Sequence, residues 1–119
     1  MREAVKNKFI ELYGDREDIR TYFAPGRVNL IGEHTDYNGG HVFPCALSYG
    51  TYAAAAKRSD DRIRFYSVNM KGGVTECGIN DFRPLEDKSW TAYPMGVMWA
   101  MSERGMKMDC GLDIVIGGD

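Results

Sequence analysis

A glycine-rich stretch, residues 26–40, concentrates the polar side chains of this 119-residue chain. Its four glycines lack a Cβ, so the backbone can turn sharply there or approach a ligand closely. Between them lie one arginine, two carboxylates, one histidine, a threonine hydroxyl and two asparagine amides. This density of donors and acceptors predicts a loop that holds a small polar molecule.

Arg27 is the permanent cation of the stretch. Its guanidinium group offers a planar fork of donors that suits phosphate oxygens. Transfer of a phosphoryl group depends on positioning and on neutralising charge, with little covalent help from the protein. Arg27 could serve such a reaction, or it could form a surface ion pair.

Glu33 and Asp36 lie three residues apart, on either side of His34, so a turn could bring both carboxylates to one ligand. Ionised carboxylates only accept hydrogen bonds, and charge-assisted bonds of this kind are among the stronger ones. The alternative is a capped turn, in which Asp36 bonds its own backbone near residues 38–39. Both interpretations can hold for Asp36.

Metal ligands are sparse in the sequence. The three cysteines are far apart and form no Cys-x-x-Cys pair, which predicts reduced thiols. The two histidines, His34 and His41, match no standard metal spacing with Asp36. We therefore expect no metal site in this chain.

The composition is that of one globular domain, with 44% apolar and 27% charged residues. A net charge of −2 gives no reason to expect a nucleic acid or an acidic membrane surface as partner. The N-terminus carries no signal peptide pattern, and the apolar runs are far below the roughly 20 residues that a membrane helix needs. These features predict a cytoplasmic protein with no membrane contact.

Two helices are expected to flank the strands that position the polar stretch. Residues 1–13 and 90–104 place apolar side chains at intervals of three or four, and glycines follow both segments. Before the stretch, residues 21–24 predict a short strand that ends at Pro25. After it, residues 41–47 are expected to be extended, with Pro44 at an edge or bulge.

The rest of the chain predicts further strands. These strands are expected at 50–56, 62–67, 74–79 and 112–116. A hairpin turn at 59–61 is expected to join the strands at 50–56 and 62–67, and a polar loop is expected at 81–89. Consecutive strands, with helices at the start and near the end, predict an α+β layer structure.

Residues 25–40, Pro-Gly-Arg-Val-Asn-Leu-Ile-Gly-Glu-His-Thr-Asp-Tyr-Asn-Gly-Gly, closely resemble the signature of the galactokinases, which belong to the GHMP kinase superfamily. Arg-Phe-Tyr-Ser at 64–67 resembles the family's strand that bears a serine near the nucleotide. Trp-x-x-Tyr-x-x-Gly-Val at 90–97 resembles a family helix, and Gly-Asp at 118–119 resembles the approach to its phosphate-binding loop. The resemblance spans essentially the whole chain.

This resemblance implies a role for each polar residue. Arg27 would lie beside the sugar hydroxyl under attack and stabilise charge in the transition state. The substrate-binding residues would be Glu33, His34, Thr35, Asp36, Asn38 and Gly39, and the nucleotide-side residues Ser67 and Trp90. A sugar without the matching hydroxyl would leave carboxylate oxygens unpaired and would be rejected. Tyr37 is expected to be packing or a wall of the site, and Trp90 could equally be core.

The resemblance also implies a reaction, the ATP- and Mg²⁺-dependent phosphorylation of the anomeric hydroxyl of α-D-galactose to galactose 1-phosphate. The expected fold is the N-terminal domain of the GHMP kinases (ribosomal protein S5 domain 2-like), a mixed sheet with helices on one face. Residues 1–119 would be a truncated part of that domain, with the galactose-binding signature at 24–48. The family's phosphate loop, Mg²⁺-associated residues and catalytic aspartate have no counterpart in the chain, so we expect it to be inactive alone.

Two other functions stay open. The chain could be a non-catalytic galactose-binding or sensor module built on the same motif. It could also belong to a kinase for a related sugar such as N-acetylgalactosamine. Sheet edges left exposed by truncation would allow an oligomer to form.

Overall fold

The structure, a computed structural model, describes residues 1–82 and 89–119, so most of the loop predicted at 81–89 lies outside the described residues. The elements in chain order are α1 (Arg2–Tyr13), β1 (Arg20–Ile31), the 3₁₀ helix η1 (Asp36–Asn38), β2 (Phe43–Lys57), β3 (Arg62–Ser67), β4 (Thr75–Gly78), α2 (Ala92–Glu103) and β5 (Leu112–Gly118). Both predicted helices are confirmed, as are the strands predicted at 62–67, 74–79 and 112–116, and each of their ends lies within two residues of the predicted end.

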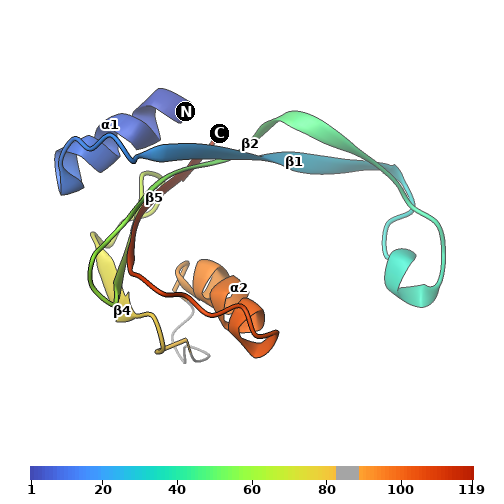
Figure 1. The fold of residues 1–119 in the computed structure, drawn as a ribbon. Coiled ribbons are helices and arrows are strands. Elements are labelled where there is room, and N and C mark those ends of the chain that lie inside the picture. Colours follow the sequence, from blue (N-terminus) through green and yellow to red (C-terminus); the bar gives the residue numbers. More distant parts are fainter. Residues whose placement is uncertain (83–88) are drawn as a thin grey trace.

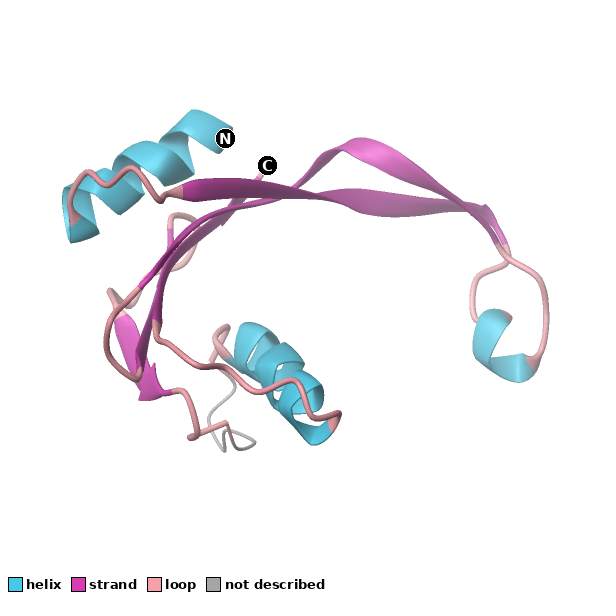
Figure 2. Ribbon diagram, viewed as in Figure 1, coloured by secondary structure: helices cyan, strands magenta, loops and turns pink. Residues whose placement is uncertain are grey.

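The described strands form one mixed sheet in the order β1-β2-β5-β3-β4, shown in magenta in Figure 2. β5 pairs antiparallel with β2 and parallel with β3. The predicted hairpin between residues 50–56 and 62–67 is therefore wrong, because β5 lies between those two strands. A central position suits β5, since consecutive residues such as Ile114 and Val115 are both buried.

The two α-helices cover opposite faces of the sheet (Figure 1). The α1 face has a cluster of buried residues: Val5, Phe9, Ala54, Ala56 and Val115. The α2 face has another: Ile63, Phe65, Cys77, Met95 and Ile114. Successive side chains of a strand point to opposite faces, so each face of β5 needs its own cover. The α+β class is confirmed, whereas the expectation of helices on one face is wrong.

β1 and β2 form a long hairpin that extends away from both α-helices and carries the glycine-rich stretch at its tip (Figure 1). The prediction that the first strand ends at Pro25 is wrong. A register shift between Pro25 and Arg27 accommodates the proline, and the strand continues to Ile31. Residues 41–47 and 50–56 belong largely to the single strand β2, and Pro44 lies at a second register shift, as predicted.

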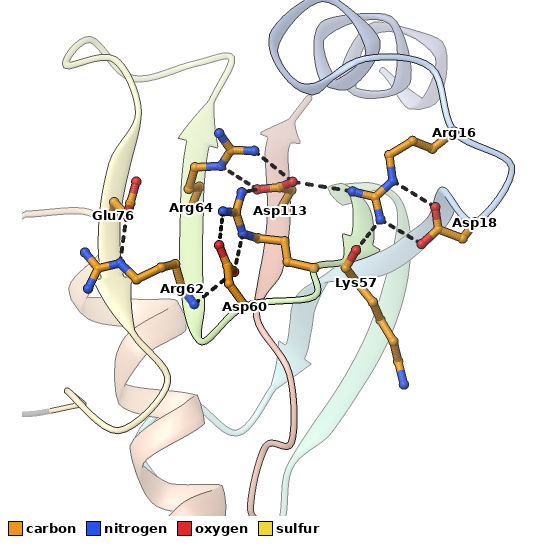
Figure 3. Close-up of polar contacts among 9 residues, drawn as sticks. Arg16, Asp18, Lys57, Asp60, Arg62, Arg64, Glu76 and Asp113 are labelled. Carbon is orange, nitrogen blue, oxygen red and sulfur yellow. Dashed lines mark hydrogen bonds and ion pairs between the residues drawn. The ribbon is translucent and has the colours of Figure 1, made fainter.

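At the end of the sheet opposite the hairpin tip, Asp113 is 1% exposed, and its carboxylate lies within ion-pair distance of three arginines (Figure 3). Its carboxylate accepts from Arg64 Nε at 2.6 Å and Arg64 Nη2 at 2.9 Å, and from Arg58 Nη1 at 3.0 Å. Arg16, between α1 and β1, lies 3.6 Å away. This Asp113 cluster joins strands β3 and β5 to the β2–β3 connection, which carries Arg58, and to the α1–β1 connection.

Tyr13 packs beside the Asp113 cluster, with the Arg64 guanidinium 4.4 Å from the centre of its ring. Its hydroxyl is buried and has no hydrogen-bond partner among the described residues. Burial, with the nearby charge of Asp113, raises the pKa of Tyr13 to about 12.

Candidate functional site

A hollow of about 240 Å³ lies at the tip of the β1–β2 hairpin. It is lined by Arg27 and Asn29 from β1, by Glu33, His34, Asp36 and Tyr37 from the connecting loop and η1, and by Val42 and Pro44 from the return of the chain. The predicted binding loop is thus a strand end followed by a turn. Four residues predicted for one site, Arg27, Glu33, His34 and Asp36, meet at this hollow.

The two ends of the loop can approach each other because two positions where a side chain would clash are occupied by glycine. Gly32 has φ 100°, and a Cβ there would lie 2.6 Å from the carbonyl oxygen of His41. Gly40 donates to Thr35 O at 2.7 Å, and a Cβ on Gly40 would lie 2.8 Å from Thr35 Cβ. Larger residues at either position would push the two ends of the loop apart.

Thr35 and Asn38 hold the loop itself. The Thr35 hydroxyl lies 2.7 Å from the carbonyl oxygens of both Gly32 and His41, at opposite ends of the loop. Asn38 Nδ2 donates to His34 O at 2.9 Å, and Gly39 N donates to Asp36 O at 3.3 Å. The sequence predicted Thr35, Asn38 and Gly39 as substrate-binding residues, but none of them lines the hollow.

Arg27, Glu33 and Asp36 are exposed, and their side chains have no hydrogen-bond or ion-pair partner among the described residues. The surface ion pair considered for Arg27 and the capped turn considered for Asp36 are therefore absent from the described part of the chain. One cation and two carboxylates remain available to a ligand. Together they can donate to an oxyanion and accept from hydroxyl groups.

His34 has φ 59°, the one positive value found among the described residues other than glycine. Its Nδ1 forms a hydrogen bond with the Tyr37 hydroxyl, and the two rings meet edge to face with centroids 5.9 Å apart. Tyr37, expected to be packing or a wall, lines the hollow and is 70% exposed. The three-residue separation of His34 and Tyr37 within a turn is the signal that could have predicted this contact.

Ser67 lies on β3 and Trp90 lies just before α2, packed against the core cluster on the α2 face of the sheet, so both are outside the hollow. Ser67 is buried at the end of β3, where its Oγ accepts from the backbone N–H groups of Asn69 and Met70, both at 3.3 Å. Trp90 packs edge-on against Phe65, with ring centroids 6.5 Å apart. The structure favours the core interpretation of Trp90, and the nucleotide roles of both residues remain predictions.

Residues 1–82 and 89–119 contain neither a cluster of metal-binding side chains nor a helix that could span a membrane. No group of three or more His, Cys, Asp or Glu side chains in these ranges could hold a metal ion. No helix in these ranges is long and apolar enough to cross a membrane.

Comparison with known proteins gives consistent results. Residues 7–57 match the family model for the galactokinase galactose-binding signature. The chain is 52% identical to a galactokinase of Bacillus subtilis over 100% of its own length, and 46% identical to one of Ligilactobacillus salivarius over 99%. It spans 31% and 30% of the length of these relatives.

Solved structures agree with the sequence relatives. The crystal structure of Lactococcus lactis galactokinase complexed with galactose matches 98% of this chain and 30% of its own, with a TM-score of 0.91 and 38% identity. Mevalonate kinase of Methanococcus jannaschii shares the fold, with a TM-score of 0.67 at 15% identity over 87% of this chain and 33% of its own. The chain is therefore similar to galactokinases over essentially its whole length, and it corresponds to about 30% of the length of the relatives that it matches.

Proposed function

We propose that this chain is the sugar-binding, N-terminal part of a galactokinase. The intact enzyme would transfer the γ-phosphoryl group of ATP to the anomeric hydroxyl of α-D-galactose. The observation that carries the proposal is the meeting of Arg27, Glu33 and Asp36 at one small hollow, with none of the three neutralised by a described residue. A structural relative that is 38% identical to the chain forms a complex with galactose.

Glu33 and Asp36 would select the sugar by accepting hydrogen bonds from its hydroxyl groups. A carboxylate cannot donate, so a sugar that lacks a hydroxyl at the right position leaves an oxygen unpaired. Sites that depend on such bonds discriminate strongly against the analogue without the group. This arrangement supports selection of one hexose among its epimers.

Arg27 would act on the phosphoryl side of the same hollow. It lies on β1, pairs in register with Ala46 of β2 and is thereby held by a strand, while the two carboxylates lie on the loop beyond it. A guanidinium group fixed in this way can donate to oxygens on which charge develops during phosphoryl transfer. We propose that Arg27 stabilises the transition state.

ATP and Mg²⁺ would be needed for turnover, as is expected of the family. Since the chain spans about 30% of its relatives, we propose that other parts of an intact galactokinase hold the phosphates and the metal ion. Ser67 and Trp90 stay proposed contributors to the nucleotide side. Galactose and ATP are accordingly the proposed partners.

Identification of the product by ³¹P NMR tests this proposal. Intact protein that carries residues 1–119 would be incubated with ATP, Mg²⁺ and D-galactose. We expect a new phosphomonoester resonance that couples to the anomeric proton of galactose, together with ADP. Parallel samples with glucose or N-acetylgalactosamine should give no new resonance. Sugar binding without any product would indicate a non-catalytic module, and a product formed only from another sugar would contradict the proposed specificity.

A further inference from the structure

We propose that Tyr37 is a positioning residue that holds the His34 imidazole in the tautomer with its proton on Nε2. In that state His34 offers the hollow a hydrogen-bond donor next to the two carboxylates. The identity of the ligand, a sugar hydroxyl, rests on the proposed function. The tautomer itself does not depend on it.

The backbone of His34 is fixed by its own loop. Its φ of 59° is a conformation that side chains other than glycine adopt rarely, and such conformations persist only where the surroundings enforce them. Asn38 Nδ2 donates to the His34 carbonyl at 2.9 Å, and the Thr35 hydroxyl joins the two ends of the loop. This conformation turns the His34 side chain to line the hollow, beside Glu33 and Asp36.

The ring of His34 is fixed by Tyr37. The Tyr37 hydroxyl forms its hydrogen bond with His34 Nδ1, and the ring planes meet at 72°. Tyr37 is 70% exposed, so burial of its ring does not account for a tyrosine at this position. His34 Nε2 has no partner among the described residues and is the nitrogen left for a ligand.

The direction of this hydrogen bond decides what Nε2 can do. A neutral imidazole has one N–H donor and one bare nitrogen acceptor, and the partner of one nitrogen sets the state of the other. If the Tyr37 hydroxyl donates to Nδ1, the imidazole proton resides on Nε2. The opposite direction would make Nε2 a third acceptor beside Glu33 and Asp36, which can themselves only accept while ionised. A hydroxyl-rich ligand needs donors as well as acceptors, so the first direction complements the hollow.

Nitrogen-15 NMR of the intact protein reads the tautomer directly, at a pH where the imidazole is neutral. Long-range ¹H–¹⁵N correlation should show a protonated Nε2 and a bare Nδ1 for His34 in the wild-type protein. In Tyr37→Phe the two ring shifts should move toward values averaged between the tautomers. Tyr22→Phe, an exposed tyrosine of β1 outside the hollow, is the matched control and should leave the His34 shifts unchanged.

Kinetics give the functional readout. Loss of one well-placed hydrogen-bond donor should raise the KM for galactose in Tyr37→Phe by roughly 3- to 10-fold, with little change in kcat. Tyr22→Phe should show no change in either constant. A wild-type His34 protonated at Nδ1, ring shifts that are identical in Tyr37→Phe, or an unchanged KM would each overturn the proposal. If the wild-type protein does not phosphorylate galactose, the proposed function fails, while the ring shifts still decide the role of Tyr37.

Discussion

Arg27, Glu33 and Asp36 keep their charges unpaired within the described residues. At the other end of the sheet, ion pairs engage the arginines Arg16, Arg58, Arg62 and Arg64. An unpaired charge held on a strand or in a tight loop is available to a ligand without first breaking an internal contact. Unpaired charges at the hollow indicate a binding site, whereas paired charges around Asp113 indicate a structural role. The free guanidinium and carboxylates are the groups that the proposed reaction uses.

The role of Arg27 predicts a defect in turnover rather than in sugar binding. Arg27→Lys keeps the charge but loses the planar fork, so kcat of the intact protein should fall on the order of 10²-fold with little change in the KM for galactose. Arg20→Lys, which alters an arginine of the same strand outside the hollow, should behave as wild type. A rise in KM at unchanged kcat would instead place Arg27 on the sugar.

The sequence predicts the members of the hollow well where they are close in the chain. Arg27, Glu33, His34 and Asp36 lie within ten residues, so one turn suffices to gather them. The sequence alone does not distinguish them from Thr35, whose equally polar side chain bonds the loop backbone. That distinction depends on φ values and on which carbonyls come within reach, which residue types alone do not fix.

At the scale of elements, the β1–β2 hairpin can hold the hollow because hydrogen bonds join the two ends of the loop at its tip. Thr35 joins the carbonyls of Gly32 and His41, and the two register shifts of β1–β2 lie next to Pro25 and Pro44. Proline positions were readable from the sequence as interruptions of a strand. The sequence did not show that a bulge would let the strand continue beyond Pro25.

Gly32 and Gly39 provide a matched pair for this loop. Both have positive φ, at 100° and 77°, but a Cβ would meet backbone atoms at Gly32 and nothing within 4 Å at Gly39. Gly32→Ala should therefore destabilise the loop by about 1–3 kcal/mol and abolish most galactose binding, whereas Gly39→Ala should cost about 1 kcal/mol and keep it. Thermal unfolding and calorimetric titration measure the two effects. Equal losses in both variants would contradict the close approach at Gly32.

At the scale of the whole molecule, β5 holds the structure together. It lies between β2 and β3, has buried apolar residues on both faces and carries the buried Asp113. Pairing of β5 with β2 and β3 joins residues about 49 to 67 positions apart in the chain, so neighbouring patterns do not reveal it. For this reason the sequence pattern predicted a local hairpin between residues 50–56 and 62–67, where the structure places β5.

Asp113→Asn tests the Asp113 cluster. The substitution leaves Arg58 and Arg64 without their shared carboxylate, and we expect a loss of about 3 kcal/mol in the free energy of unfolding. The arginine side chains are partly exposed, which limits the loss. Asp18→Asn breaks an exposed pair with Arg16, which solvent screens, and should cost far less than Asp113→Asn. Chemical denaturation of both variants measures the difference, and equal losses would contradict the account.

Tyr13→Phe tests the unpaired Tyr13 hydroxyl, which lies on the α1 face of the sheet beside the Asp113 cluster. The pKa of Tyr13 is raised above its ordinary value of 10.0 to about 12, so the unfolded chain releases this proton more readily, and the free energy of unfolding falls as the pH rises from about 10 toward 12. Tyr13→Phe should retain or slightly raise the melting temperature at pH 7, because it removes a buried donor without a partner. Its melting temperature should also fall less than that of the wild-type protein between pH 10 and 12. A lower melting temperature at pH 7 would show that the hydroxyl makes a stabilising contact.

Calorimetric titration of sugars into the intact protein tests the central claim, that the hollow at the hairpin tip binds galactose. We expect saturable binding of D-galactose by the wild-type protein and no measurable binding of glucose. Glu33→Gln should weaken galactose binding by roughly 10- to 100-fold through loss of a charge-assisted acceptor, whereas Glu76→Gln, on β4 outside the hollow, should bind as wild type. Absence of galactose binding by the wild-type protein, or equal affinity in Glu33→Gln, would contradict the account.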